Sequence, residues 1–381
     1  MKKLIALLLI VVMSFSFSAC SSGEDTSTSE EPEAAEQEEV AEEVPEQGEE
    51  SSDFYFSLIA KGYQHQYWAT VAEGAAAAAE DLGVEIYFDG PPSETDIDVQ
   101  VNMFKQELAK NPDAIAVAPL SADSLAESLE TCAAEGIPVI CFDSGIPDDT
   151  SGAVRGTAST NNVSAAAIAA EKFGEQEELI TKLTNATAEE PVVIGCLAQD
   201  AVSSSQIERT KGFVEKMAEI AEEYQPGKVS IEGHDVYANP VDGAAVIIRV
   251  EVGATTSATD LQTAANALLN MNGISAIFCV NEGAVTGFLA AVSDGEDLAE
   301  GGKYEDLLVA GFDAGAAQKN AVRQGWFLGS VTQDPYTIGY KAVEMCYSAA
   351  NGEEVEDIDT GAKWYDASNI DDEDIAMLVY D

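Results

Sequence analysis

The sequence predicts an α/β protein with two lobes of similar size, each built on a parallel sheet. Short apolar runs alternate with helical stretches from Asp53 to the end of the 381-residue chain, and this alternation is typical of right-handed strand–helix–strand crossovers. The runs are continuously apolar, as expected for strands that helices bury on both faces. Roughly ten such strands are too many for one simple doubly wound domain, so the pattern favours two lobes.

The elements of the first half follow from this alternation. Strand-like apolar runs are each followed by a turn and a helical stretch, the first of which is rich in alanine, a strong helix former. The expected strands are Phe54–Ala60, Val84–Phe88, Ala114–Ala118, Pro138–Phe142 and the weaker Ala153–Thr157, and the expected helices are Tyr67–Leu82, Asp96–Lys110 and Ala122–Glu135.

The second half repeats the theme after one long predicted helix, Asn161–Leu183. The expected strands are Pro191–Leu197, Ile274–Val280, Leu307–Phe312 and Phe327–Val331, and the expected helices are Ser205–Tyr224, Thr259–Met271, Gly283–Val292, Ala316–Arg323 and Pro335–Ala350. The stretch Val229–Val252 fits least well. It holds two strand-like pieces, around His234-Asp235 and at Val246–Val252, and we interpret it as an insertion specific to the second lobe.

The N-terminus has the pattern of an export signal. Lys2 and Lys3 precede the apolar run Leu4–Met13, which is too short for a bilayer span of about 20 residues. Phe17-Ser18-Ala19-Cys20 resembles a lipobox, although Leu is usual where Phe17 stands. We therefore predict a signal peptide over residues 1–20 and a lipid on Cys20, which places the protein on the outer face of the cell membrane. A plain secreted protein is the alternative.

An acidic segment separates this signal from the predicted fold. Residues 21–53 hold fourteen Asp and Glu and no Lys or Arg, so they cannot bury enough apolar surface to order, and like charges extend them. We predict a flexible tether. The whole chain carries a net charge of −51, which argues against nucleic acid and against electrostatic docking on anionic lipid. Such a charge favours a soluble monomer.

The cysteines and histidines indicate neither a disulfide framework nor a metal centre. Five cysteines follow Cys20, none in a CxxC pair, and the chain has two histidines. Cys141, Cys196 and Cys279 lie in or beside apolar strand-like runs, where cysteine behaves as a small hydrophobe. A Cys132–Cys141 bridge is the alternative. We expect no metal and no cofactor.

Candidate binding residues follow the predicted strands, because ligands of open α/β sheets bind beyond the carboxyl ends of the strands. These positions are rich in carboxylates, amides and hydroxyls, with one aromatic pair, Tyr67-Trp68. Carboxylates and amides can bind vicinal hydroxyls, and flat aromatic rings pack on sugar C–H faces. The segments are Lys61–Trp68, Asp143–Gly145, Gln199–Asp200, Ser203–Ser205, Asn281–Gly283, Asp313 and Thr332–Pro335. This chemistry predicts a site for a small polyhydroxylated ligand.

Four of these motifs, in this order, resemble the sugar-binding type I periplasmic binding proteins, the group that contains ribose-binding protein. They are Gln64–Trp68 with Glu73-Gly74, Val280–Gly283, Gly311–Asp313 and Gly329–Pro335, and the resemblance extends over 53–381. It implies two Rossmann-like lobes joined by a three-strand hinge. The expected passages lie near Ser159, Gln333 and Asp357, giving a first lobe of 54–159 plus 334–356 and a second lobe of 160–333 plus 357–381.

The resemblance also implies roles for individual residues. Tyr67 and Trp68 match the aromatic pair that packs on the sugar ring, Asp143 matches a first-lobe carboxylate, and Asn281 and Asp313 match second-lobe polar ligands. Gln333 matches a hinge residue, and Gln64 and His65 join the candidate set. The family often has an Arg within Ser205–Arg209. We align Gln206 or Ile207 with it and assign Arg209 to a structural role, which puts ribose itself in doubt.

Each candidate has an ordinary structural alternative. Tyr67 and Trp68 could be core residues under the first helix. Asp143, Asp313 and Asn281 could be helix N-caps. His65 could be a surface turn residue, Gln333 could brace a hinge strand, and the serines at 203–205 fit an N-cap cluster better than a ligand set.

The sequence thus predicts a binding protein without catalysis that delivers a monosaccharide to the permease subunits of an ABC importer. A sensory protein for a sugar-like signal, or a protein for another polar solute, would have the same pattern. We find no nucleophile elbow, P-loop or dinucleotide fingerprint, and we disfavour Asp143 and Asp313 as a glycosidase pair. The export signal and the acidic charge argue against a regulator of the lactose-repressor type. In addition, no basic helix-turn-helix precedes the predicted fold.

Overall fold

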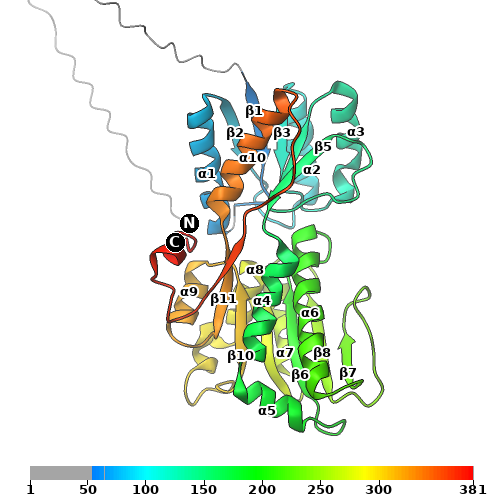
Figure 1. Ribbon diagram of the computed structural model, residues 1–381, viewed down its shortest axis with the longest axis vertical. Coiled ribbons are helices and arrows are strands. Elements are labelled where there is room, and N and C mark those ends of the chain that lie inside the picture. The colour runs from blue at the N-terminus through cyan, green and yellow to red at the C-terminus, as the bar shows by residue number, and fades with distance from the viewer. Residues whose placement is uncertain (1–53, 64, 381) are drawn as a thin grey trace, which may run out of the picture. The chain divides into compact units, whose positions relative to one another are not determined.

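The computed structural model describes residues 54–63 and 65–380, and these form two α/β lobes (Figure 1). The predicted two-lobe α/β architecture is confirmed. The predicted signal peptide, Cys20, the tether and Gln64 lie outside the described residues. Among the described residues, no helix is long and apolar enough to cross a membrane.

The first lobe has a six-stranded parallel sheet in the order β12-β5-β4-β3-β1-β2. Its strands are β1 (Tyr55–Ile59), β2 (Glu85–Asp89), β3 (Ala114–Val117), β4 (Val139–Phe142), β5 (Val154–Ser159) and β12 (Ile358–Asp359). Its helices are α1 (Gln66–Leu82), α2 (Ile97–Leu108), α3 (Ala126–Glu135), preceded by the short η1 (Asp123–Leu125), and α10 (Pro335–Ala350).

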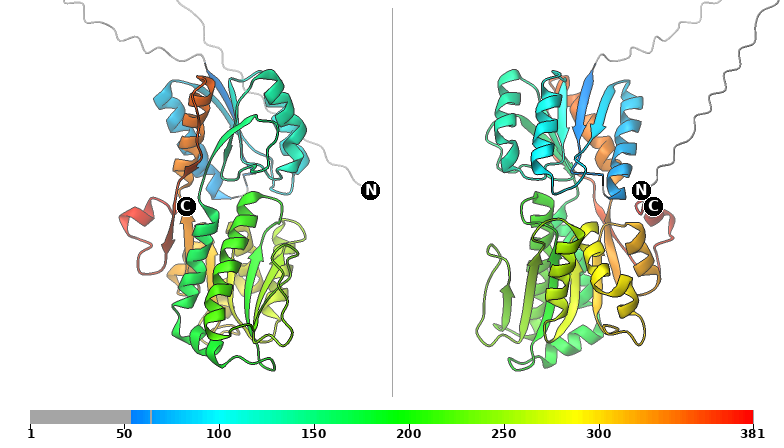
Figure 2. Two further views of the ribbon diagram at one scale, coloured as in Figure 1. Left: turned by 45° about the vertical axis from the view of Figure 1, so that its right-hand side comes forward. Right: turned by 180° about the vertical axis from the view of Figure 1, so that it is seen from behind.

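Strand side chains alternate between two helical layers in this lobe. Phe56 and Leu58 pack with residues of α1 and α10, whereas Ile59 packs with residues of α2 and α3, because successive strand residues point to opposite faces. Helices α1 and α10 lie side by side (Figure 2). A Cβ on Gly74 would stand 1.9 Å from the Tyr336 carbonyl oxygen, so these two helices approach closely because this position lacks a side chain.

The second lobe has a seven-stranded sheet in the order β13-β11-β10-β9-β6-β8-β7. Its strands are β6 (Val192–Ala198), β7 (Val229–Glu232), β8 (Val246–Val252), β9 (Ile274–Cys279), β10 (Leu308–Phe312), β11 (Gly329–Gln333) and β13 (Ala362–Tyr365). Its helices are α4 (Asn162–Gly174), α5 (Glu177–Asn185), α6 (Ser204–Tyr224), α7 (Ala258–Leu269), α8 (Glu282–Ala291), η2 (Ser293–Leu298), α9 (Ala316–Arg323) and the terminal α11 (Glu373–Ala376). All strand pairs are parallel except β13 with β11, which is antiparallel, so the second sheet is mixed and not purely parallel as predicted.

Two predicted elements of this lobe were wrong. The stretch 229–252 is not an insertion, because β8 pairs along its whole length with β6, and β7 extends the same sheet. His234 and Asp235 lie in the loop after β7 and not in a strand. The predicted helix Asn161–Leu183 is two helices, because Gln176 is extended, with φ −85° and ψ 112°, and begins α5 as its N-cap.

The chain passes between the two sheets three times. It leaves the first sheet after β5, returns after β11, and leaves again between β12 and β13. The expected third boundary at Asp357 was too early, since Ile358 and Asp359 still pair with β5 of the first sheet. We therefore place this passage between Asp359 and Ala362.

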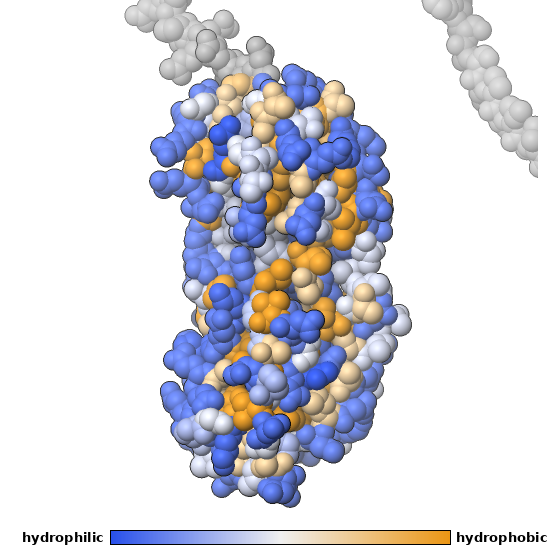
Figure 3. Space-filling view, turned by 90° about the vertical axis from the view of Figure 1, so that its right-hand side faces the viewer, coloured by the Kyte–Doolittle hydropathy of each residue, from blue (hydrophilic) through white to orange (hydrophobic). Residues whose placement is uncertain are grey.

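The five cysteines beyond Cys20 are buried and have free thiols. This confirms the predicted buried positions of Cys141, Cys196 and Cys279, and Cys132 and Cys141 do not form a bridge. Hydrophilic residues cover much of both lobes on the face seen in Figure 3, with apolar residues in patches between them.

Candidate functional site

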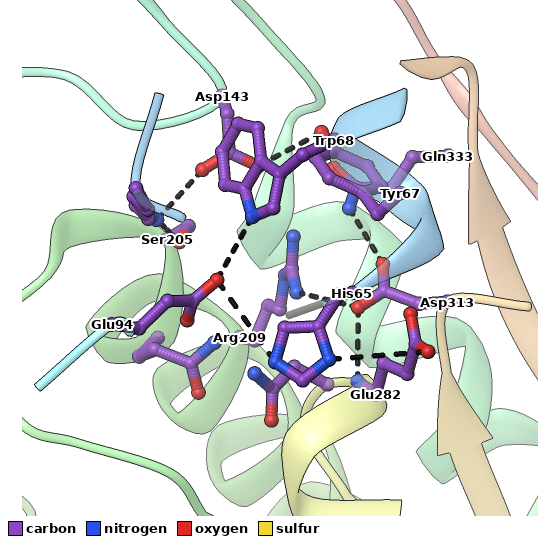
Figure 4. Close-up of a pocket in the computed structure, with 13 residues that line it drawn as sticks. His65, Tyr67, Trp68, Glu94, Asp143, Ser205, Arg209, Glu282, Asp313 and Gln333 are labelled. Carbon is purple, nitrogen blue, oxygen red and sulfur yellow. Dashed lines mark hydrogen bonds and ion pairs between the residues drawn. The ribbon is translucent and has the colours of Figure 1, made fainter. Parts of the chain in front are cut away.

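A small polar cavity lies where the carboxyl ends of strands from both lobes meet (Figure 4). Its volume is about 30 Å³. The first lobe lines it with Lys61, His65, Tyr67, Trp68, Glu94 and Asp143, and the second with Ser205, Gln206, Arg209, Asn281, Glu282, Asp313 and Gln333. Seven of the eight predicted site residues are thus brought together, and Gln64 is the one outside the described residues.

Two aspartates at strand ends form opposite walls of this cavity. Asp143 follows β4 and Asp313 follows β10, and both have left-handed backbone conformations, with φ of 60° and 76°. Aspartate tolerates this region better than most residues. Neither occupies the N-cap position of a helix, and α9, which follows Asp313, has Gly315 as its N-cap. The N-cap alternative therefore does not account for either residue.

The first-lobe wall is organised by Lys61, which stands two residues after the last residue of β1. Its ammonium lies 2.6 Å from Asp143 Oδ2 and donates to Ser144 Oγ at 2.6 Å and to Ser205 Oγ at 3.0 Å. The Tyr67 hydroxyl donates to the other oxygen of Asp143 at 2.8 Å. Burial alone would raise the pKa of Asp143, but Lys61 and Arg209 hold it below its ordinary value, so this carboxylate is ionised at neutral pH.

The second-lobe wall is organised by Arg209, which makes structural contacts within its lobe, as predicted, and also lines the cavity. Its Nη1 lies 3.7 Å from Asp313 Oδ2, and its Nε donates to Asn162 at 2.8 Å. Nη1 also donates to the Val280 carbonyl oxygen at 3.2 Å, and the guanidinium lies 3.8 Å from the ring centre of Phe312. The site therefore has an arginine on its wall. It is Arg209, the last residue of the segment Ser205–Arg209, and not Gln206 or Ile207.

Asp313 is held from several directions. Gln333 Nε2 donates to its Oδ1 at 2.7 Å, and the backbone N–H of Glu282 donates to Oδ2 at 3.1 Å. Gln333, at the end of β11, thus lines the cavity and holds the Asp313 carboxylate.

The aromatic pair lies in the first-lobe wall and is almost buried. Tyr67 and Trp68 are 5% and 2% exposed, and their rings meet edge to face at 4.9 Å. The Trp68 indole N–H donates to Glu94 Oε1 at 2.9 Å. The two rings belong both to the core under α1 and to the cavity lining.

A polar chain joins the lobes beside these rings. Gln199 Nε2 donates to Glu94 Oε2 at 2.6 Å, and Gln199 Oε1 accepts from Asn281 Nδ2 at 3.0 Å. Asn281 is also the N-cap of α8, because its Oδ1 accepts from the backbone N–H of Ala284 at 2.9 Å. Asn281 therefore fulfils the predicted cap and faces the cavity as well.

His65 stands between two carboxylates from different lobes. Its Nε2 lies 4.0 Å from Glu94 Oε1, and its Nδ1 lies 3.9 Å from Glu282 Oε1. Burial raises the pKa of Glu282 to about 7, against the opposing influence of His65. Glu282 therefore changes charge near neutral pH, which sets it apart from the ionised Asp143 across the cavity.

Comparison with known proteins places this architecture in a family. Residues 56–354 match the family model described as a periplasmic binding protein domain. The chain belongs to the periplasmic binding protein family. It is 25% identical over 308 residues to the D-allose-binding periplasmic protein of Escherichia coli (strain K12), a match that covers 80% of this chain and 87% of that protein.

Solved structures of periplasmic binding proteins and related transport proteins share the fold. An ABC transporter, LacI family transcriptional regulator from Brachyspira murdochii is 40% identical, with a TM-score of 0.72, over 86% of this chain and 99% of that one. A carbohydrate transporter solute binding protein from Agrobacterium radiobacter, in complex with D-arabinose, has 24% identity and a TM-score of 0.68 over 86% and 99% of the two chains.

Six lining residues of this binding-protein site were not among the predicted eight: Lys61, Glu94, Ser205, Gln206, Arg209 and Glu282. Lys61 and Glu282 stood in the strand-end segments that the sequence singled out. Ser205 and Arg209 are spaced four residues apart on one helix, which places them on one face. Glu94 lies in the loop after β2, outside the segments that the sequence singled out.

Proposed function

We propose that this protein is a lipid-anchored extracytoplasmic solute-binding protein that captures a monosaccharide between its lobes and delivers it to an ABC importer. The observation that carries the proposal is the cavity itself, where two fixed aspartates, an amide set and an aromatic pair from both lobes converge. The proposal is binding without catalysis.

The chemistry of the walls suits vicinal hydroxyls. Asp143 and Asp313 are acceptors held by the cations Lys61 and Arg209, so each can accept from sugar hydroxyls while its cation donates to a neighbouring oxygen. Trp68 and Tyr67 offer apolar ring surface for the C–H face of a sugar. A ligand lacking these hydroxyls would leave buried polar groups unpaired, which is the basis of selectivity.

Binding in this proposal requires the lobes to open. A cavity of about 30 Å³ has room for water and not for a sugar. The lobes are bonded to each other across it, for example by Lys61 to Ser205 at 3.0 Å and by Gln199 to Glu94 at 2.6 Å. Sugar hydroxyls would replace such bonds and bridge the lobes again, so the ligand favours a closed form that contacts it from both sides.

The moving units in this proposal follow the strand connections. They are residues 54–159 with 334–359, and residues 160–333 with 362–380. Three connecting segments limit the lobes to opening and closing, which suits capture of a ligand.

Relatives support a sugar and an importer. One relative is named for binding D-allose, and the carbohydrate transporter protein from Agrobacterium radiobacter was solved with D-arabinose. The Brachyspira murdochii protein at 40% identity is described as an ABC transporter. The anchor rests on the lipobox-like Phe17–Cys20 and the acidic segment after it. Metabolic labelling with palmitate should mark the wild-type protein and not Cys20→Ala.

A thermal-shift panel tests the ligand class. The chain without its signal peptide is heated with D-allose, D-arabinose, D-tagatose and D-fucose, with glycerol and an amino acid mixture as controls. A sugar at 100 times its Kd should stabilise the folded form by about 2.7 kcal/mol. If no sugar shifts the melting temperature while another polar solute does, the sugar assignment is wrong and the binding-protein assignment stands.

A further inference from the structure

The C-terminal segment after β13 returns to the site between the lobes. Ile370 and Ile375 in this segment are buried, at 2% and 4% exposure. The Leu378 carbonyl oxygen accepts from Thr332 Oγ1 at 3.0 Å, at the end of the strand that leads back to the first lobe. The segment is therefore packed into the fold as far as Tyr380, which is 9% exposed.

Tyr380 touches both lobes behind the cavity wall. Its hydroxyl accepts from the backbone N–H of Ala314 at 3.3 Å and donates to Glu282 Oε2 at 3.4 Å. Its ring meets the ring of Tyr67 at 6.1 Å, inclined by 71°. Glu282 and Ala314 belong to the second lobe, whereas Tyr67 belongs to the first and donates to Asp143.

We propose that Tyr380 is a positioning residue of the binding site, which holds the Glu282 carboxylate at the cavity wall and braces Tyr67 against the second lobe. Tyr380 does not line the cavity and acts through these two residues, which do. The effect of Tyr380 on ligand affinity rests on the proposed function. The effect of its hydrogen bond on the Glu282 carboxylate can be measured without a ligand.

The electrostatics around Glu282 make this hold measurable. His65, Glu94, Asp313 and Tyr380 face its carboxyl group. Burial, Asp313 and Glu94 raise the pKa of Glu282, whereas His65 and the Tyr380 hydrogen bond lower it. Burial also raises the pKa of Tyr380 well above its ordinary value, so its hydroxyl keeps its proton and stabilises the charged carboxylate. Removing that hydroxyl must therefore raise the pKa of Glu282.

The first experiment is a pH titration of the ligand-free protein by NMR, with the carboxyl carbons of glutamate labelled. The Glu282 signal is assigned by its loss in E282Q. We expect Y380F to move the Glu282 midpoint upward from about 7, and Y336F, which changes an exposed tyrosine on α10, to leave it in place. An unchanged midpoint in Y380F would overturn the proposal, and Y380F keeps the ring, so it should fold.

The second experiment measures sugar affinity by calorimetry at pH 6, 7 and 8, with whichever panel sugar gives the largest thermal shift. Y380F should weaken binding about threefold to tenfold, the effect typical of one hydrogen bond. In an E282A background the same change should cost much less, because the hydrogen-bond partner is absent. Equal losses in both backgrounds contradict the proposal. If no sugar binds at all, the proposed function fails while the NMR titration still decides the role of Tyr380.

Discussion

The two walls of the cavity carry the same pair, an aspartate and a cation, but hold it in different ways. On the second-lobe wall, Arg209 is fixed within its own lobe by Asp313, Asn162, Val280 and the Phe312 ring. On the first-lobe wall, Lys61 holds Asp143 and Ser144 but also reaches across to Ser205 of the second lobe. We infer that the second wall is preformed, whereas the first is completed when the lobes close.

Removing the cation of the preformed wall should have the largest effect. Arg209→Ala leaves Asp313 and Asn162 buried without their partner, and losing one side of a buried pair typically costs about 3–5 kcal/mol. Urea unfolding followed by far-UV circular dichroism should show this loss, together with loss of any sugar-induced thermal shift. Arg323→Ala removes a half-exposed arginine that pairs with Asp371 at 2.9 Å, and this control should change stability by less than about 1 kcal/mol. Similar losses in both variants would contradict a preformed, essential wall.

The cation of the other wall should matter less for folding and more for closure. Lys61→Met keeps the apolar stem and removes the charge, leaving Asp143 with the hydroxyls of Tyr67 and Ser144 as its donors. We expect a loss of roughly 2–3 kcal/mol, because a charged group loses its strongest partner while another bond remains. Small-angle scattering of the ligand-free variant should report a more open average arrangement than in the wild type. A scattering profile that opens as much in Arg209→Ala would remove the distinction between the walls.

The position of each residue relative to a strand end decides whether the sequence could predict its place in the site. Asp143, Asn281, Asp313 and Gln333 all stand at or directly after strand ends, and topology alone places such positions at one edge of a sheet. The seven predicted residues that the structure describes were found in this way. The succession of most strands and helices along the chain likewise followed from the alternation of apolar runs and helical stretches.

Lys61, Ser205 and Glu282 stood in the strand-end segments, but other residues of the site depend on information that no strand end contains. Arg209 reaches the cavity because one face of α6 points into it. The four-residue spacing between Ser205 and Arg209 places both residues on that face. Glu94 reaches the cavity from a loop, and Tyr380 contacts the lining residues Glu282 and Tyr67 from the C-terminal segment. Tertiary packing sets the paths of both segments. The bounds of β8 were predicted, at Val246–Val252, but it was interpreted as part of an insertion because it follows β7 without an intervening helix, so the alternation that identified the other strands is broken there.

The buried carboxyl group of Glu282, which lines the cavity, should make the free energy of unfolding depend on pH. Its pKa is raised to about 7 in the folded protein, mainly by burial, against an unfolded value of about 4.3. Between these values the folded state binds more protons, so its stability falls as the pH rises from 5 to 8. We expect Glu282→Gln to remove roughly 2–3 kcal/mol of this change in stability over that range. Glu127→Gln, on an exposed glutamate of α3, is the control that should leave the slope unchanged, and a Glu282→Gln profile as steep as the wild type would contradict the assignment.

The smallest expected effect tests the bond by which the first wall reaches across. Ser205→Ala removes the acceptor of Lys61 at 3.0 Å and of Ser144 at 2.9 Å, and both bonds join the lobes. Because Lys61 keeps Asp143, we expect a loss of only about 0.5–1.5 kcal/mol, confined to the closed form. Scattering should therefore show partial opening while the urea midpoint barely moves. Ser203→Ala is the matched control, since Ser203 stands at the N-cap of α6 without a side-chain cap bond, contacts Ser205 Oγ at 3.5 Å and does not bond to Lys61. Opening by Ser203→Ala to the same extent would mean that the serine segment acts through the helix end and not through the bridge to Lys61.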